Sequence, residues 1–349
     1  MDNCTLPSDY DVFIEDDFTH DLTEECHKYD DKVFAAQFLP TFYSLMFILG
    51  LLGNAFLVLI LVKYKGLKVV VNIYFLNIAI SNFLFLVTFP FSIHTAIHSW
   101  DLGDATCKII SGFYSVGFYG YVCFLVLLII HRYLAIVHVG RFRLATKKTT
   151  CGIIISTWGI AMLVTLPEYM LSQVQMEDRD YICYFVQIYQ YPPGDEKFWK
   201  YFLTLKMNIL GILIPLFVFI FCYMRIKKTS RYKEKRYELL RLIFVITLVF
   251  MGLWTPYNLV LFLKTFQEHL NLNDCDINYH LDKAIQVTKI IANTHCCIYP
   301  MICGLLDEIF LKRFCYFFHP RNETEGHFSE GSEQQSSTTK GPPYHSTRL

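Results

Sequence analysis

Seven long apolar segments constrain the fold of this chain more than any other feature of its sequence. They cover residues 37–62, 69–95, 107–138, 150–172, 199–226, 239–264 and 281–306. An α-helix needs about 20 apolar residues to cross a bilayer, and every segment reaches that length. The core of a soluble domain does not require apolar runs of this kind. The sequence therefore predicts an all-α membrane protein, a seven-helix bundle over residues 37–306.

The charged residues indicate how the bundle is oriented. Charged residues are only 18% of the chain, and they gather between the apolar segments. One set of connections is basic and holds Lys63, Lys65, Lys68, Arg141, Arg143, Lys147, Lys148, Arg225, Lys227, Lys228, Arg231, Lys233, Lys235 and Arg236. The other set holds Asp101, Asp104, Glu177, Asp178, Asp180, Glu268, Asp274 and Asp276. Basic connections stay in the cytoplasm. The sequence thus predicts a multi-pass plasma-membrane protein with its N-terminus outside and its C-terminus inside.

Five of the twelve cysteines fall on the predicted outer side, where disulfides persist. Cys107 at the start of the third helix can reach Cys183 in the second outer loop. Cys26, just before the first helix, can reach Cys275, just before the seventh, which leaves Cys4 over. The inner cysteines lack the spacing of zinc ligands, so packing is the expected role of the His-Cys-Cys run at 295–297.

Several motifs resemble those of the rhodopsin-like G protein-coupled receptors. They are Asn54, Trp158 and Pro215 in helices one, four and five, together with the Cys107–Cys183 tie. The runs "FMGLWTPYNLVLFLKTFQEHLNLNDC" (250–275), "TFP" (88–90), "WDLG" (100–103) and "THCCIYP" (294–300) are similar to the C-C chemokine receptors in particular.

Longer runs resemble an atypical, chemerin-binding branch of that family. These runs are "LILVKYKGLK", "SQVQMEDRDYICYF", "EKFWKYFLTLKMNI" and "NYHLDKAIQVTKIIANTHCC". The resemblance extends from about residue 37 to 319. It implies a seven-helix receptor whose extracellular protein ligands are chemerin, C-C chemokines or both.

The cytoplasmic end of the third helix departs from the pattern of signalling relatives. There, an Asp precedes the Arg and holds it through a charge-assisted contact that is exchanged on activation. Here His131 precedes Arg132. A neutral imidazole offers a hydrogen bond without neutralising the guanidinium, so we expect a weaker restraint on Arg132. A tolerated surface substitution is the alternative interpretation of this site.

Three further positions depart from the family pattern. Asn82 stands where relatives carry an intramembrane Asp, which coordinates sodium there. In helix seven, Tyr299 and Cys303 replace the Asn and the Tyr of the Asn-Pro-x-x-Tyr motif, while Pro300 is kept. With His131, these changes favour loss of ordinary G-protein coupling.

Pocket residues are expected at Glu168, Trp254 and Lys289. Relatives usually carry a Glu where Lys289 stands, so the local charge is reversed. Lys289 faces the pocket in this interpretation, and pairing with an acid such as Asp282 is the alternative. A retinal-binding lysine would lie seven residues before Pro300, at Asn293, so retinal binding is excluded.

Residues 1–36 are predicted to form an acidic, disordered extracellular tail. Its carboxylates include Asp9, Asp11, Glu15, Asp16, Asp17, Asp21, Glu24, Glu25, Asp30 and Asp31, against Lys28 alone. Such a tail should steer basic chemokines, with Tyr10 and Tyr29 as candidate sulfation sites. A solvated tail without a binding role is the alternative. Asn3 lies in an Asn-Cys-Thr glycosylation sequon.

The cytoplasmic end is expected to hold two further parts. Residues 307–319 predict an amphipathic helix on the inner leaflet, with Cys315 as a candidate palmitoylation site. Residues 320–349 predict a disordered tail whose Ser and Thr residues could recruit arrestin-type adaptors once phosphorylated.

The predicted function is a cell-surface receptor that presents or removes its ligand without activating a G protein. A conventional chemotactic receptor is the alternative, favoured by Arg132, Trp254 and Pro256, which the family pattern also carries. A transporter or membrane enzyme is disfavoured, because the helices hold almost no carboxylates and no catalytic set. No cofactor, metal ion or nucleic acid is expected as a partner.

Overall fold

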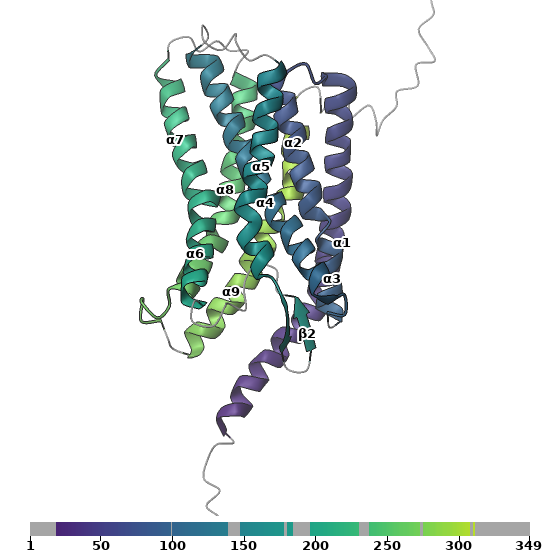
Figure 1. Ribbon diagram of the computed structural model, residues 1–349, viewed down its shortest axis with the longest axis vertical. Coiled ribbons are helices and arrows are strands. Elements are labelled where there is room, and N and C mark those ends of the chain that lie inside the picture. The colour runs from purple at the N-terminus through teal and green to yellow at the C-terminus, as the bar shows by residue number, and fades with distance from the viewer. Residues whose placement is uncertain are drawn as a thin grey trace, which may run out of the picture.

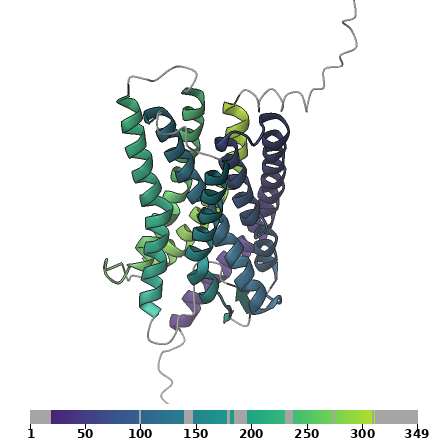
Figure 2. The same ribbon diagram turned by 45° about the horizontal axis from the view of Figure 1, so that its top comes forward.

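A computed structural model describes residues 19–98, 100–138, 147–177, 180–183, 196–229, 237–272, 275–307 and 310. Among these, the side chains of 19–37, 147, 175–177, 180–182, 196, 237, 238 and 275 are left out of the description. Seven helical spans are long and apolar enough to cross a membrane, at 38–65, 70–97, 103–137, 148–171, 197–227, 239–265 and 276–306. They match the seven predicted segments in order and stand side by side in one bundle (Figure 1 and Figure 2). The predicted seven-helix bundle is confirmed.

The described elements follow one another along the chain as helices, with one short hairpin between the fourth and fifth spans. They are α1 (Thr19–Ile60), η1 (Leu61–Lys65), α2 (Val70–Leu86), α3 (Phe89–Ile97), α4 (Gly103–Val137), α5 (Lys147–Leu171), β1 (Val174–Glu177), β2 (Asp180–Cys183), α6 (Glu196–Asn208), η3 (Ile209–Leu213), α7 (Ile214–Lys227), α8 (Tyr237–Thr265), α9 (Cys275–Asn293) and α10 (His295–Leu306).

Three spans are interrupted near a proline, which has no backbone N–H and clashes with the preceding turn. The second span divides into α2 and α3 just before Pro90, where the Thr88 hydroxyl donates to the carbonyl of Phe85 at 2.7 Å. The fifth contains the wider π-helical turn η3 directly before α7, whose second residue is Pro215. The seventh divides at Thr294, six residues before Pro300. These bends make backbone groups available to side chains.

The two ends of the bundle differ in structure, and we name them by their residues. At the disulfide end, β1 and β2 pair antiparallel, with Val174 opposite Cys183. Cys183 is bonded to Cys107 in the first turns of α4, as predicted. The Arg132 end is the opposite one, where α4 finishes at Val137. Figure 1 shows the disulfide end at the bottom.

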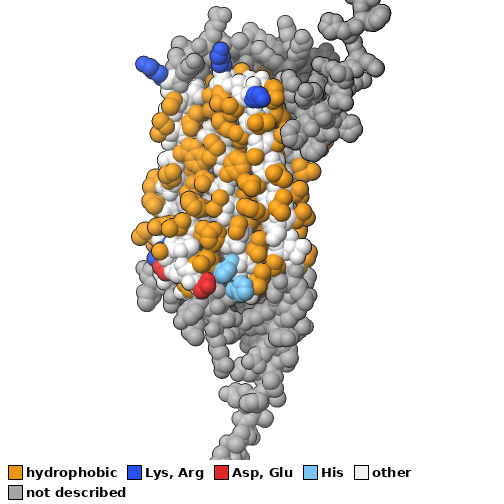
Figure 3. Space-filling model, turned by 90° about the vertical axis from the view of Figure 1, so that its right-hand side faces the viewer, with side chains coloured by type: hydrophobic (Ala, Val, Ile, Leu, Met, Phe, Trp, Pro, Cys, Tyr) orange, Lys and Arg blue, Asp and Glu red, His pale blue; other side chains and the backbone are white. Residues whose placement is uncertain are grey.

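The outer surface of the bundle suits a lipid environment. Large apolar side chains face outward along its length, among them Leu163, Phe217 and Leu305, which are each more than 60% exposed. Figure 3 shows this apolar band on one face, with Lys or Arg side chains at the Arg132 end and acidic, basic and His side chains at the disulfide end. Apolar surface facing outward and charge confined to the ends is the pattern of a membrane-spanning bundle.

Close helix packing fills the interior. Gly117 of α4 lies against α2, where an added Cβ would come within 2.9 Å of the backbone of Ser81 and Phe85. Any larger residue would force these two helices apart. This contact fixes the distance between α4 and α2.

The N-terminal tail differs in part from its prediction. Composition predicted disorder for residues 1–36, whereas α1 begins at Thr19. Nucleating a helix is costly but extending one is not, because each added residue contributes a hydrogen bond. The membrane-spanning part of α1 supplies the nucleus, so the preceding residues continue the helix. Residues 1–18 lie outside the described residues.

Candidate functional site

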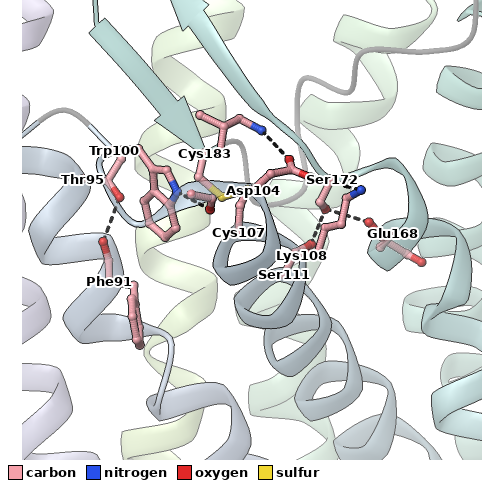
Figure 4. Close-up of a disulfide and its surroundings, with 12 residues drawn as sticks. Phe91, Thr95, Trp100, Asp104, Cys107, Lys108, Ser111, Glu168, Ser172 and Cys183 are labelled. Atoms are coloured by element: carbon pink, nitrogen blue, oxygen red, sulfur yellow. Dashed lines mark hydrogen bonds and ion pairs between the residues drawn. A yellow bond between two sulfur atoms is a disulfide. The ribbon is translucent and has the colours of Figure 1, made fainter.

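The disulfide positions the hairpin over the start of α4 (Figure 4). Trp100 packs with Cys107 and Cys183 in a small buried cluster, and its indole N–H donates to the Gly103 carbonyl at 2.9 Å. The Val174 N–H donates to the carboxylate of Asp104 at 3.1 Å, which ties the first strand to the same helix. These contacts hold the hairpin and the loop at Trp100 against the first turns of α4.

A second polar contact at this end joins His94 and Asp101. The His94 Nε2 atom lies 2.9 Å from an oxygen of Asp101, and this hydrogen bond lowers the pKa of the Asp101 carboxyl. The ring of His98 lies 5.4 Å from that of His94. The contact links the end of α3 to the loop before α4.

Glu168, a predicted pocket residue, is held by groups of this chain. It is buried in α5, forms an ion pair with Lys206 of α6, and accepts a hydrogen bond from the Tyr119 hydroxyl at 3.0 Å. The Lys206 ammonium also donates to the Val164 carbonyl at 2.8 Å. Lys206 was not among the predicted site residues, although a lysine within an apolar span is a recognisable signal. The pair balances the Glu168 charge and joins three helices.

Lys289 lies half-buried on α9, with its ammonium 5.9 Å from the centre of the Tyr114 ring on α4. Asp282, considered as its partner, instead forms an ion pair with Lys264 of α8 at 2.8 Å. Beneath Lys289, the Tyr114 hydroxyl donates to Asn293, whose amide donates to the Tyr43 hydroxyl. Lys289 thus lies next to the ring of Tyr114, the first residue of a hydrogen-bonded chain that runs from α4 through α9 to α1.

Trp254 is fully buried at the centre of an aromatic cluster. Its ring lies 4.3 Å from that of Phe118 and 5.4 Å from that of His295. The rings of Phe85 and Tyr121 meet His295 edge-on at 4.9 and 5.0 Å. His295 therefore links this cluster to α10, a role that its motif alone did not predict.

Asn82 belongs to a buried chain of neutral amides. Its Nδ2 donates to the Asn54 Oδ1 at 3.0 Å, and the Asn54 Nδ2 donates to the carbonyls of Gly50 and Cys296 at 2.8 and 2.9 Å. Cys296 lies four residues before Pro300, which has no N–H to donate to it. The proline thus releases the carbonyl that Asn54 uses. The chain connects α1, α2 and α10 without a formal charge.

Tyr299 makes a contact that an Asn at its position is too short to make in the same way. Its side chain is buried, and its hydroxyl donates to the backbone carbonyl of Phe75 on α2 at 3.1 Å. Its ring also packs edge-on against that of Tyr121 at 5.9 Å. Cys303, one turn further along α10, is buried as well. A hydrogen bond therefore joins α10 to α2 at Phe75.

His131 packs against the same stretch of α2. Its ring meets that of Tyr74 edge-on at 5.5 Å, and both His131 and Arg132 are partly buried. Tyr74 is the direct neighbour of Phe75. Two of the altered positions, from α4 and α10, thus contact adjacent residues of α2.

At the Arg132 end, the π-helical turn η1 contacts the residues that follow α10. Lys65 forms an ion pair with Asp307, and its ammonium lies 4.6 Å from the centre of the Phe310 ring. Most of the predicted interfacial helix 307–319 lies outside the described residues, so it stays a prediction.

Some predicted residues lie outside the described side chains. They are Asn3, Tyr10, Asp11, Glu15, Asp16, Asp17, Cys26, Tyr29, Cys275 and Cys315. The Cys26–Cys275 disulfide and the tail and lipid-anchor sites therefore stay predictions.

Comparison with known proteins bears on the whole chain. Residues 53–302 match the family of 7 transmembrane receptors (rhodopsin family). C-C chemokine receptor-like 2 of Homo sapiens is 46% identical over 353 aligned residues, covering 100% of both chains. The protein of that name from Macaca mulatta is 46% identical, covering 96% of this chain and 98% of its own. C-C chemokine receptor type 1 of Homo sapiens is 43% identical, covering 92% of this chain and 90% of its own.

Proposed function

This chain belongs to the rhodopsin family of seven-transmembrane receptors and, within it, to the C-C chemokine receptors, and on that basis we propose that it binds chemerin, C-C chemokines or both without activating a G protein. It is a multi-pass plasma-membrane receptor and not an enzyme. In the proposed role it presents or removes its ligand at the cell surface.

The proposed orientation has the disulfide end outside. The basic connections flank the Arg132 end, which suits the cytoplasm. A disulfide persists in the oxidising extracellular space. The acidic N-terminal tail would then face extracellular proteins and attract basic ones over long range.

The observation that carries the silent-receptor proposal is the hydrogen bond from Tyr299 to the carbonyl of Phe75. Activation of a seven-helix receptor requires its inner helix ends to exchange polar partners, and a buried bond between helices seven and two opposes that exchange. The neutral Asn82–Asn54 contact supports the same conclusion, since it holds no carboxylate to bind a cation.

The surroundings of His131 support it further. Where signalling relatives place a carboxylate beside the arginine, this chain places a ring that packs on Tyr74. Aromatic edge-to-face pairs prefer a fixed geometry and contribute about 0.5–1.5 kcal/mol beyond their burial. Arg132 loses its usual acidic partner at position 131, while helix three gains a packing contact to helix two.

The test has two independent readouts on cells that express the full chain. Binding of labelled chemerin and of a panel of C-C chemokines identifies the ligand. Nucleotide exchange on a co-expressed G protein, measured with the bound ligand, tests silence. We expect saturable binding with no ligand-dependent exchange, and robust exchange by the native chain would refute the silent-receptor proposal.

A matched variant sharpens the second readout. His131→Asp, Tyr299→Asn and Cys303→Tyr together restore the family pattern at three positions. We expect the triple variant to bind ligand as the native chain does and to gain nucleotide exchange. If the native chain already signals and the variant adds nothing, the conventional chemotactic receptor is the correct function. That alternative draws support from Trp254, which lies within a complete aromatic cluster.

A further inference from the structure

Three buried aromatic rings from three different helices meet at Tyr121. The Tyr121 ring of α4 stacks on that of Phe250 of α8, with centroids 4.8 Å apart and an angle of 21° between the ring planes. It also meets the ring of His295 of α10 edge-on at 5.0 Å, and the rings of Phe250 and His295 lie 5.8 Å apart. Each ring therefore contacts the other two. We name Tyr121, Phe250 and His295 together the three-ring contact.

Two further contacts hold the three-ring contact on the α10 side. The Nδ1 atom of His295 donates to the carbonyl of Ala292 at 2.9 Å, which fixes the orientation of the imidazole. The ring of Tyr121 also meets that of Tyr299, one turn further along α10, edge-on at 5.9 Å. Aromatic pairs prefer stacked and edge-on arrangements, so they are weakened when one ring shifts against the other. Moving α8 away from α4 and α10 would disturb both contacts of Phe250.

The proline of α8 gives this helix a point at which it can bend. Pro256 has no N–H to donate to the carbonyl of Gly252, four residues earlier, and sharp helix bends occur mostly at proline. The part of α8 before Gly252 lies toward the Arg132 end, because Leu240 packs with Ile136 near the end of α4. Phe250 belongs to this part. The three-ring contact therefore holds the part of α8 that a bend at Pro256 would displace.

A ligand bound at the disulfide end changes the Arg132 end only if the helices adopt a second arrangement that the ligand favours. Because packed helices are rigid, such a change is a shift or rotation of one helix against its neighbours. A bend of α8 at Pro256 is a change of this kind. The three-ring contact opposes it, since α8 would have to give up its ring contacts with both α4 and α10.

We propose that Tyr121 is a positioning residue that holds the Arg132-side part of α8 against α4 and α10 and keeps the Arg132 end of the bundle closed. The proposal rests on the proposed function only for its consequence, the silence of the receptor. The restraint is aromatic packing between helices three, six and seven. It acts in addition to the hydrogen bond from Tyr299 to Phe75, which joins helices seven and two.

The experiment measures how far α8 stands from α2 in the full-length receptor in nanodiscs, without ligand. Spin labels replace Val69, which directly precedes α2, and Arg241 of α8, two exposed residues near the Arg132 end. They are attached through an unnatural amino acid, so that the native cysteines stay unlabelled. Double electron–electron resonance then gives the distribution of distances between the labels.

We expect one narrow distance in the native chain. In Tyr121→Leu, a population at longer distance should increase about tenfold or more, because two aromatic pairs and the contact with Tyr299 are lost. Phe250→Leu removes the partner ring from α8 and should produce the same longer population. It tests the same contact if Tyr121→Leu fails to fold.

Two matched variants separate this role from general packing. Tyr121→Phe keeps the ring and should keep the native distribution. Phe124→Leu removes a fully buried ring of the same helix, which packs against Trp158 of α5 at 5.4 Å. Both leucine variants on α4 should lower the thermal stability, whereas the longer distance should appear in Tyr121→Leu and not in Phe124→Leu.

An unchanged distribution in Tyr121→Leu and Phe250→Leu would overturn the proposal, and so would an equal change in Phe124→Leu. A change in Tyr121→Phe as large as that in Tyr121→Leu would assign the restraint to the hydroxyl and would also overturn it. Failure of the proposed function is a separate result. Ligand-dependent nucleotide exchange by the native chain would refute silence, whereas the distances are measured without ligand or G protein.

Discussion

The hydroxyl of Tyr299 donates a hydrogen bond to the backbone carbonyl of Phe75, 3.1 Å away on another helix. Both residues are almost fully buried, and Tyr74, the neighbour of Phe75, packs against His131. Departures from the family pattern on α10 and α4 thus converge on one turn of α2. The altered residues are therefore not missing contacts: Tyr299 forms a hydrogen bond to α2, and His131 packs against α2.

The first prediction removes only the hydroxyl. Tyr299→Phe keeps the ring contacts with Phe75 and Tyr121 but loses the bond between helices seven and two. Hydrogen bonds between membrane helices contribute about 0.6 kcal/mol on average, and Phe75 keeps its own helical partner. We expect a drop of about 0.5–1 kcal/mol in the free energy of unfolding, measured as reduced thermal stability in nanodiscs.

The same variant should also loosen the packing of the helices at the Arg132 end. Spin labels on α10 and α2 near the Arg132 end should report a broader distance distribution than in the native chain. Tyr223→Phe, an exposed tyrosine on α7, is the control. An unchanged distribution in Tyr299→Phe would mean that packing alone holds these helices together.

The second prediction restores the intramembrane carboxylate. Both amide hydrogens of Asn54 are used on the carbonyls of Gly50 and Cys296, so only its oxygen faces position 82. In Asn82→Asp a carboxylate oxygen would meet that oxygen. We expect a loss of about 1–3 kcal/mol or more, the cost of a buried charged group without a partner.

A cation should relieve this loss. Sodium chloride should raise the thermal stability of Asn82→Asp more than the chloride of a bulky organic cation at equal ionic strength. The native receptor should respond equally to both salts. If Asn82→Asp were as stable as the native chain without sodium, the Asn54 amide would have to be free to turn.

The sequence predicted those parts of the structure that depend on one segment at a time. Bilayer thickness alone sets the length of a spanning helix, so all seven spans were found, and Cys107–Cys183 followed from topology. The prolines Pro90 and Pro300 mark where a helix can be interrupted, but they do not show which group takes the place of the missing N–H donor. The Cys296 carbonyl that Pro300 leaves without a donor takes its side-chain partner, Asn54, from another helix, so this contact could not be read from one segment.

Partners across the bundle were the main failure, for a physical reason. Glu168 and Lys206 are 38 positions apart, and no spacing rule relates residues on different spans. Asp282 was considered as the ion-pair partner of Lys289 because both lie on one helix. Asp282 instead forms its ion pair with Lys264 of α8. The Phe75 carbonyl that accepts from Tyr299 belongs to the backbone, so no residue type marks it.

The third prediction concerns the buried Glu168–Lys206 pair. Removing one partner of a buried ion pair leaves an uncompensated charge and costs about 3–5 kcal/mol. We expect both Glu168→Gln and Lys206→Met to lower the unfolding temperature markedly. The double variant should recover much of that loss, because neither charge is then left alone.

The matched control is the exposed pair at the same end. Lys197 and Glu268 are 74% and 55% exposed, against 9% and 7% for Lys206 and Glu168. Breaking the exposed pair should lower the unfolding temperature far less than breaking the buried one, because solvent screens the two charges. If additive losses were measured for Glu168→Gln and Lys206→Met, the two groups would not interact as a pair.

The fourth prediction is a pH dependence at Glu268. The Lys197 ammonium donates to its carboxylate at 2.9 Å and, with Lys200 and His269 nearby, lowers the pKa of Glu268 below its ordinary value of 4.5. A carboxyl with a lowered pKa in the folded state stabilises that state above its ordinary pKa. This contribution is lost as the pH falls through the folded pKa.

The unfolding temperature of the native receptor should therefore exceed that of Glu268→Gln slightly near neutral pH, and the difference should vanish as the pH falls below the lowered pKa of Glu268. It should also shrink in high salt, because the pair is exposed. In a Lys197→Gln background, Glu268→Gln should show a much smaller pH-dependent difference, since the main cause of the lowered pKa is gone. A difference that grew on acidification would place the stabilising contact on the protonated carboxyl, contrary to the geometry of the ion pair.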